Sequence, residues 1–343
     1  MFVKKPLALV LGVCATGMLA AQSAQAYVYA GSELSIDELT ISIDSGGNPI
    51  SIEGFGYSTS TSAELNGAAV GDADSCGGQP LNNDCGVAPV LSSDAVNAPG
   101  SGGNIRGAGD YSLSGVTSTN YANSNAEITT AELVNFVPSS VQQVSEANLV
   151  GNGTASAGTS VQSNTNLFFL FQTGSGSVEI TLSFDAFLDQ FAEIDNTALL
   201  GGPTIDANAQ YSSSVTASLT GSGVDASWTS DGVSSNCSSG SAGCDDPSDP
   251  SDLTITQSTG AGIAFGIPFG DPSSVSNGTG GPQSYLVTLT ADCPVAVCNW
   301  TLNLAATTGV VIRNEVPAPA SVALMGLGLL GLAGIRRRNK AKA

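Results

Sequence analysis

Strict alternation of apolar and polar residues over 177–184 is the feature that most constrains the fold. The stretch reads SVEITLSF, and its apolar residues occupy every second position: Val178, Ile180, Leu182 and Phe184. Successive side chains of a strand point to opposite faces, so this pattern is typical of an antiparallel strand with one buried face. Phe187, Leu188 and Phe191 interrupt the period. We expect extended structure to continue through them, with a helical turn or a β-bulge as the alternatives.

Other short stretches have strand-like patterns and are separated by Gly-rich turns. We predict strands over 33–43 (with one irregularity), 50–57, 167–171, 207–221, 252–256, 284–291 and 299–312, and ordered structure at 126–137. A turn at 46–49 would join the first two strands into a hairpin, and SSVQQVSEANLV at 139–150 is predicted as a short helix. Many strands with almost no helix signal favour an all-β fold, an antiparallel β-sandwich or jelly-roll-like ectodomain.

The composition changes between about residues 58 and 125. Gly, Ser, Asn, Asp and Ala dominate there, and the apolar periodicity is lost. A structureless loop of this length is unusual in a compact domain. We therefore predict an insertion of short strands and loops within an ectodomain that spans 27–313.

Charge is distributed very unevenly. Residues 27–315 contain all 29 acidic residues, no lysine and only two basic residues, Arg106 and Arg313, and the whole chain has no histidine. Such a surface repels nucleic acid and anionic membranes. It suits solubility, cation binding or a location outside the cell.

The N-terminal 26 residues have the pattern of a secretory signal peptide. Lys4 and Lys5 precede an apolar segment at 7–21, and Ala24-Gln25-Ala26 forms a cleavage site for signal peptidase. We expect the mature chain to start at Tyr27 and the signal helix to be removed.

Six cysteines remain after this cleavage, in three close pairs: Cys76 and Cys85, Cys237 and Cys244, Cys293 and Cys298. Export makes disulfides the natural interpretation, and nearest-neighbour pairing is the simplest of fifteen connectivities. Zinc is disfavoured because no pair has the C-x-x-C spacing and no histidine is present.

The residue types needed for common catalytic sites are missing. Serine–histidine and cysteine–histidine catalysis need an imidazole, and a phosphate-binding Walker loop needs a G-K-[ST] sequence. A carboxylate pair could serve a glycosidase, but Glu179, Asp185, Asp189 and Glu193 fit ordinary solvated positions on the polar face of a strand. We expect a protein that is not an enzyme.

Calcium is the one metal for which the sequence offers ligands. GDADSCGGQPLNND and CDDPSDPSD supply hard oxygen ligands beside cysteines, and the candidates are Asp72, Asp74, Asp84, Asp245, Asp246 and Asp249. The match to an EF-hand loop is incomplete, and Asx-rich turns are the alternative. No other cofactor is expected. Carbohydrate could stack on Trp228, Trp300, Tyr211 or Tyr285, although aromatic residues are few.

The C-terminal region combines a Pro-x-Pro motif, an apolar segment and a basic end. Residues 318–335 carry no charge and could span a thin bilayer as a single transmembrane helix, with the basic tail at 336–343 in the cytoplasm. A buried core helix is the alternative. The motif residues are Val316, Pro317, Ala318, Pro319, Ala320, Arg336, Arg337 and Arg338.

This arrangement over 316–343 resembles a PEP-CTERM protein-sorting signal, with Ala318 in place of the usual glutamate. The resemblance implies an exosortase as partner, removal of the tail near residues 316–319 after transient anchoring in the inner membrane, and delivery to the cell envelope or extracellular matrix of a Gram-negative bacterium. We expect a cell-surface or matrix protein for adhesion or biofilm formation, with exopolysaccharide as a further candidate partner and no nucleic acid. The alternatives are a carbohydrate- or calcium-binding module and, less favoured, a glycan-active enzyme.

Overall fold

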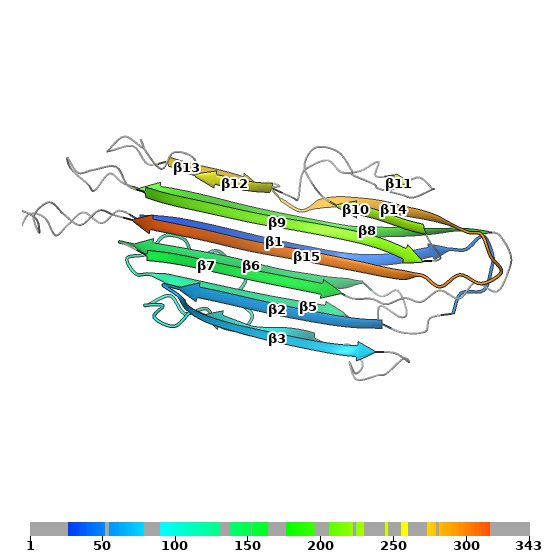
Figure 1. The fold of residues 1–343 in the computed structure, drawn as a ribbon, viewed down its shortest axis with the longest axis horizontal. Helices are drawn as coiled ribbons and strands as arrows, with labels where there is room; N and C mark the ends of the chain where they lie inside the picture. The colour runs from blue at the N-terminus through cyan, green and yellow to red at the C-terminus, as the bar shows by residue number, and fades with distance from the viewer. Residues whose placement is uncertain are drawn as a thin grey trace, which may run out of the picture.

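The computed structural model describes twelve ranges of the chain: 27–51, 55–78, 90–130, 138–151, 153–163, 176–195, 206–221, 224–229, 244–245, 255–259, 273–278 and 281–315. Within them the protein is all-β, and two antiparallel sheets pack as a sandwich whose strands run along its long axis (Figure 1). The predicted all-β sandwich is confirmed. The predicted signal helix and transmembrane helix lie outside these ranges, and no helix in the described part could cross a membrane.

The first sheet has eight strands. In spatial order they are β11 (Cys244–Asp245), β14 (Gln283–Cys293), β8 (Gly176–Asp195), β1 (Tyr27–Asp44), β6 (Ser139–Val150), β5 (Tyr121–Thr130) and β4 (Val90–Asn97), and β13 (Ser273–Gly278) also pairs with β8. Every pairing is antiparallel.

The second sheet has seven strands. In spatial order they are β10 (Val224–Thr229), β9 (Asp206–Gly221), β15 (Thr301–Glu315), β7 (Gly153–Ser163), β2 (Phe55–Leu65) and β3 (Ala68–Gly78), and β12 (Ile255–Thr259) pairs with β9. Strands that are neighbours in a sheet are often distant in sequence, as β1 and β8 are.

Strand β8 keeps the predicted alternation along its described length. Its even-numbered side chains are buried from Val178 to Ile194. The expected continuation of extended structure is confirmed, and Phe187 and Phe191 simply lie on the outer face, the face directed away from the second sheet. The irregularity predicted in 33–43 is also confirmed. It is a β-bulge in β1, where Glu38 has a φ of 54° and the register with β8 shifts.

Two sequence predictions are wrong in this region of the fold. The turn after β1 forms, with positive φ at Gly46 and Gly47, but β2 then enters the second sheet and pairs with β3 and β7 instead of β1. The predicted helix at 139–150 is strand β6, between β1 and β5. Polar residues at inward positions, such as Gln143 and Ser145, concealed its period of two.

The described parts of residues 58–125, where we predicted an insertion of short strands and loops, contribute strands to both sheets. Strands β2 and β3 form a long hairpin around Asn66 and Gly67, both with positive φ as a tight hairpin turn requires. Strands β4 and β5 belong to the first sheet. The described residues 98–120, here called the strap, form a long connection without strands between β4 and β5, and the strap crosses the outer face of the first sheet.

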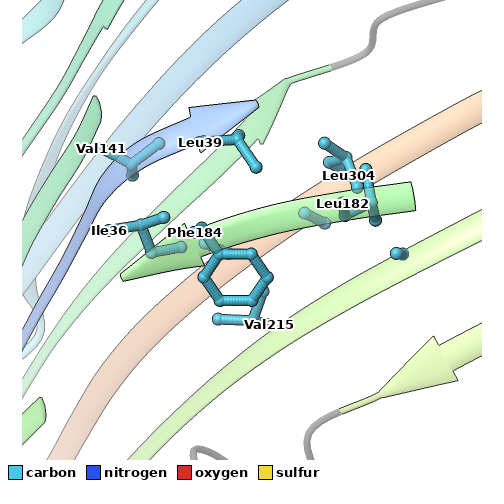
Figure 2. Close-up of a pocket in the computed structure, with 10 residues that line it drawn as sticks. Ile36, Leu39, Val141, Leu182, Phe184, Val215 and Leu304 are labelled. Atoms are coloured by element: carbon cyan, nitrogen blue, oxygen red, sulfur yellow. The ribbon is translucent and has the colours of Figure 1, made fainter. Parts of the chain in front are cut away.

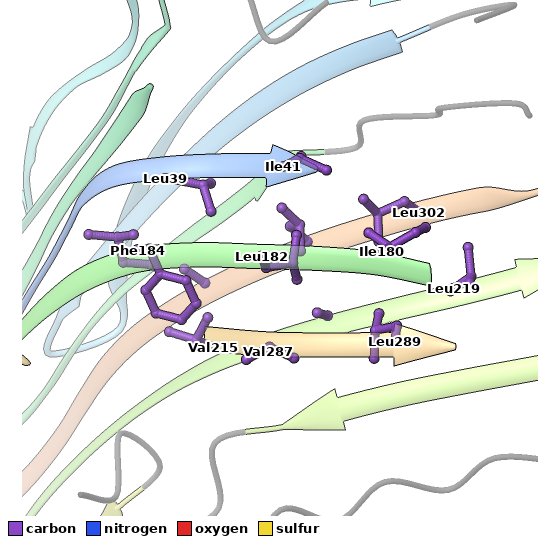
Figure 3. Close-up of a cluster of buried hydrophobic side chains, with 14 of the residues drawn as sticks. Leu39, Ile41, Ile180, Leu182, Phe184, Val215, Leu219, Val287, Leu289 and Leu302 are labelled. Atoms are coloured by element: carbon purple, nitrogen blue, oxygen red, sulfur yellow. The ribbon is translucent and has the colours of Figure 1, made fainter. Parts of the chain in front are cut away.

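Two apolar clusters fill the interior, one towards each end of the sandwich. Figure 3 shows part of the larger one, in which Ile180, Leu182 and Leu289 of the first sheet face Leu219 and Leu302 of the second. The smaller cluster lies where β1 begins and β15 ends. It includes Val28, Leu149, Ile194, Tyr211 and Ile312.

A belt of buried polar side chains separates the two clusters. In the first sheet it is a row of residues in direct register across four strands: Gln190, Ser32, Ser145 and Ser124. In the second sheet the corresponding row is Ser213, Thr308, Thr159 and Thr61. We call these eight residues the polar belt.

The polar belt joins the two sheets by hydrogen bonds. Gln190 Nε2 donates to Ser213 Oγ at 3.1 Å, and the Ser145 hydroxyl lies 2.8 Å from that of Thr159 and 3.0 Å from that of Thr308. Buried polar groups are tolerated when they are paired. The belt also specifies register, because a slip by one residue would move its polar side chains to the outer faces.

A small apolar cavity of about 30 Å³ lies in the larger cluster, beside the bulge of β1. Figure 2 shows the side chains around it, including Ile36, Leu39, Phe184 and Val215. Its volume is far below that of a small-molecule site. We interpret the cavity as a packing gap where the bulge interrupts the pleat.

Candidate functional site

Arg106 anchors the strap to the first sheet through a completely buried side chain. It forms an ion pair with Glu146 on β6, with 2.7 Å between Nη2 and Oε2. Its other guanidinium nitrogens donate at 2.9 Å to Asn123 Oδ1 and to the carbonyl oxygens of Asp110 and Ser112. A buried ion pair is stabilising only when such additional hydrogen bonds satisfy its remaining groups.

The second carboxylate oxygen of Glu146 accepts two further hydrogen bonds. Oε1 accepts hydrogen bonds from Tyr29 Oη at 2.8 Å and from the backbone N–H of Gly115 at 2.6 Å. Burial first, and then the negative charge of Glu146, raise the pKa of Tyr29. Tyr121 donates to the carbonyl oxygen of Gly115, and its pKa is raised by the same two causes. The strap is therefore held at several points along its length.

A groove of about 480 Å³ opens between the strap and the outer face of the first sheet. Its lining comes from β1, β6, β8, the strap and the residue that precedes β14. It comprises Glu33, Leu34, Ser35, Asp37, Gly109, Asp110, Tyr111, Ser112, Gln142, Phe187 and Pro282. This volume is in the range of small-molecule binding sites.

Like charges face one another across β1 and β8 in and beside this groove. Glu33 is paired in register with Asp189, and Asp37 with Asp185. Side chains directly opposite on one face have Cβ atoms about 5 Å apart, and two like charges there are destabilising. The carboxylates of β8 lie on the outer face, where the alternation predicted them.

The groove has no exposed basic side chain among the described residues. Arg106 is buried beneath the strap, and Arg313 lies on β15 in the other sheet. Partial burial, and then the charge of Asp189, raise the pKa of Glu33 above its ordinary value. The groove is consequently an acidic site: Arg106 lies 3.5 Å from the Asp110 carboxylate, but no basic side chain of the described residues forms an ion pair with Glu33 or Asp37.

The predicted calcium residues are not brought together by the described structure. Asp72 and Asp74 lie on one face of the exposed edge strand β3 rather than in a loop. Asp245 belongs to β11, and Asp84, Asp246 and Asp249 lie outside the described residues. In the described ranges no group of three or more His, Cys, Asp or Glu could hold a metal ion. Calcium binding stays a prediction.

One predicted disulfide is confirmed and the others lie partly outside the described ranges. Cys293 and Cys298 are bonded and close the connection between β14 and β15. Cys76 is disulfide-bonded, while Cys85 and Cys237 are outside the described ranges, as is the side chain of Cys244.

The aromatic residues suggested for sugar stacking are mostly in the core. Trp300, Tyr211 and Tyr285 are almost completely buried, so the prediction that sugars could stack on them is wrong. The side chain of Trp228 lies outside the described residues. Phe187 and Tyr111 line the groove instead. Sequence reasoning missed them because the strap has no motif; the only signal was the interrupted alternation at Phe187.

Comparison with known proteins identifies one family feature. Residues 315–338 match the family model of the PEP-CTERM protein-sorting motif, whereas no curated protein and no solved structure matches the chain. The match covers the sorting residues Val316–Ala320 and Arg336–Arg338, which lie outside the described structure. At its C-terminal end, this all-β chain carries the PEP-CTERM motif of exported proteins that exosortases process and sort to the cell envelope.

Proposed function

We propose that this protein is a non-enzymatic structural component of the cell surface or extracellular matrix, with a role in adhesion or biofilm formation. The observation that carries the proposal is the position of the sorting motif. The match begins at residue 315, and β15, an interior strand of the second sheet, ends at Glu315. Cleavage near residues 316–319 would therefore remove the tail without removing any part of a described strand.

The fold supports a structural role. Its two sheets are joined through the polar belt, and the strap is fixed by a buried ion pair. A sandwich with these internal connections can present its surface outside the cell without a partner. The acidic surface of residues 27–315 also suits a solvated exterior.

The proposed route has three steps. Signal peptidase removes residues 1–26, the apolar segment at 318–335 holds the chain in the inner membrane with its basic tail in the cytoplasm, and an exosortase then releases the ectodomain. The host would be a Gram-negative bacterium. The surface or matrix protein that results has no nucleic-acid partner and no resident cofactor.

Cell fractionation tests this route. In wild-type cells the protein should be found in the outer envelope or matrix fraction. In cells that lack the exosortase it should accumulate in the inner membrane. If the protein reaches the same fraction in both strains, exosortase sorting is wrong.

A second candidate function is binding of carbohydrate or calcium outside the cell. The groove under the strap supports the carbohydrate part of this function, because the groove is concave and partly aromatic, whereas calcium binding rests on the sequence candidates alone. The full-length chain in detergent can be melted with and without Ca²⁺ or exopolysaccharide. An increase in Tm with either would support this function, and no change with both would contradict it.

A further inference from the structure

We propose that the groove under the strap binds an oligosaccharide whose sugars carry free amino groups. This inference rests on the second candidate function, binding of carbohydrate, and is independent of the sorting route. It assigns one site and one class of ligand: the groove, and a chain of positively charged sugars.

The groove provides both kinds of contact that a sugar ring needs. Phe187 of β8 and Tyr111 of the strap offer aromatic surface for the apolar faces of sugar rings. Tyr111 donates a hydrogen bond to Glu127 at 3.3 Å, which helps to hold its ring in place. Ser35, Ser112 and Gln142 offer hydrogen-bonding groups for sugar hydroxyls.

Charge then selects among sugars. Glu33 faces Asp189 and Asp37 faces Asp185 across β1 and β8. An ammonium group has three donors and can serve two facing carboxylates at once, which converts a repulsive pair into an attractive arrangement. A neutral sugar would leave the repulsion in place, and a carboxylated or sulfated sugar would increase it.

The groove exists before a ligand arrives because its strap wall is fixed. Arg106 donates to the carbonyl oxygens of Asp110 and Ser112, and these two residues are part of the groove lining. Asp110 also lies 3.5 Å from the Arg106 guanidinium through its own carboxylate. A preformed site loses less conformational entropy on binding than a loop that must first be ordered.

Isothermal titration of the full-length chain in detergent tests the ligand class with three oligosaccharides of equal length. A glucosamine oligomer carries the amines, its N-acetylated form is the neutral control, and a galacturonic acid oligomer reverses the charge. In mildly acidic buffer we expect the glucosamine oligomer to bind at least about tenfold more tightly than the neutral one. Equal or tighter binding of the neutral or the acidic oligomer would overturn the proposal.

Variants test the place of binding. Glu33→Gln, Asp189→Asn and Phe187→Ala should each weaken binding of the glucosamine oligomer by about fivefold or more. Glu179→Gln is the matched control, since Glu179 faces Asp44 in a like-charge pair of the same two strands and neither member of that pair lines the groove, whereas Asp189 faces the lining residue Glu33. Its affinity should stay within about twofold of the wild type.

Two outcomes would overturn the proposal and show instead that amino sugars are attracted to the acidic surface in general. One is an equal loss of binding in Glu179→Gln and Glu33→Gln. The other is undiminished binding in Phe187→Ala together with equally tight binding of spermine, a polyamine without sugar rings. Neither outcome affects the sorting route, which fractionation tests separately.

Discussion

At the scale of single residues, Arg106 is one of only two basic residues in 27–315, and its positive charge is buried inside the protein. Its side chain meets Glu146, Asn123 and two strap carbonyl oxygens. The sequence indicates that this arginine is isolated, but it does not indicate its partner, because Glu146 is forty residues away and is reached only through the register of β5 and β6.

Replacing the Arg106 guanidinium by an uncharged side chain should strongly destabilise the protein. Arg106→Met leaves Glu146 as an unpaired buried charge, so we expect the free energy of unfolding to fall by about 3–5 kcal/mol in chemical denaturation. Arg313→Met is the matched control, because it removes the only other cation of residues 27–315 from an exposed position, and should change stability by about 0.5 kcal/mol or less. Similar losses in both variants would contradict the structural role of Arg106.

Glu33 should make stability depend on pH. Its pKa is raised above the ordinary 4.5, so the folded state binds more protons than the unfolded state in this range and stability falls as pH rises through the folded pKa. Glu33→Gln should therefore be more stable than the wild type at neutral pH, by about 0.2–1 kcal/mol. The difference should vanish below about pH 4.5, where the wild-type side chain is protonated in both states. Melting curves across this range would contradict the argument if the variant is less stable at neutral pH.

At the scale of strands, the polar belt explains both a stabilising feature and a failed prediction. Strand β6 places Gln143 and Ser145 towards the core, where Ser145 bonds to Thr159 and Thr308 of the second sheet. A pattern that counts only apolar residues cannot recognise such a strand. In β8 the same pattern succeeded because apolar side chains occupy the inward positions of its first half.

The belt hydrogen bonds can be measured by a double-mutant cycle. Ser145→Ala removes the partner of two buried hydroxyls and should lower the free energy of unfolding by about 1–3 kcal/mol. Thr308→Val should lower the free energy of unfolding less in the Ser145→Ala background than in the wild type, because removing both partners leaves fewer unpaired groups. Ser183→Ala, on the outer face of β8, is the control and should be nearly neutral. Strictly additive losses would show that Ser145 and Thr308 do not interact.

Because of the apolar cavity, we expect the same substitution, alanine to valine, to have opposite effects on stability at two positions of β9. Ala217 of β9 lines the cavity, so Ala217→Val should fill it and raise the free energy of unfolding by about 0.5–2 kcal/mol. Ala209 on the same strand is completely buried in the smaller cluster, and Ala209→Val should overpack it and lower stability by about 1–3 kcal/mol. Thermal melting compares the two, and equal destabilisation would mean that no usable space exists beside Ala217.

At the scale of the whole molecule, the two ends of the described chain leave the sandwich at one end. Val28 and Ala30 of β1 share the smaller core cluster with Val310 and Ile312 of β15. Figure 1 shows β15 ending at the end of the sandwich where β1 begins. The predicted signal peptide and the sorting motif would therefore join the described chain at the same end, while the Cys293–Cys298 disulfide closes a connection beside the other cluster. This arrangement would suit the route proposed above, in which the domain is held at a membrane through its C-terminal tail before an exosortase releases it.

The features that sequence reasoning predicted are the local ones. The alternation in β8 and the sorting motif at 315–338 each depend on residues close together in the chain. The order of strands in the sheets, the burial of Trp300 and the acidic groove depend on contacts between distant segments, such as β1 with β8 and the strap with β6. Their information lies in packing, which a linear pattern does not contain.

Mass spectrometry of the mature C-terminus tests the central claim, sorting by an exosortase, most directly. The protein would be isolated from wild-type cells and from cells without the exosortase, and its C-terminal peptides would be mapped. We predict that wild-type protein ends near residues 316–319, with the basic tail absent, and that the deletion strain retains the chain through residue 343. An intact tail on the mature wild-type protein, or the same cleavage in both strains, would contradict the claim.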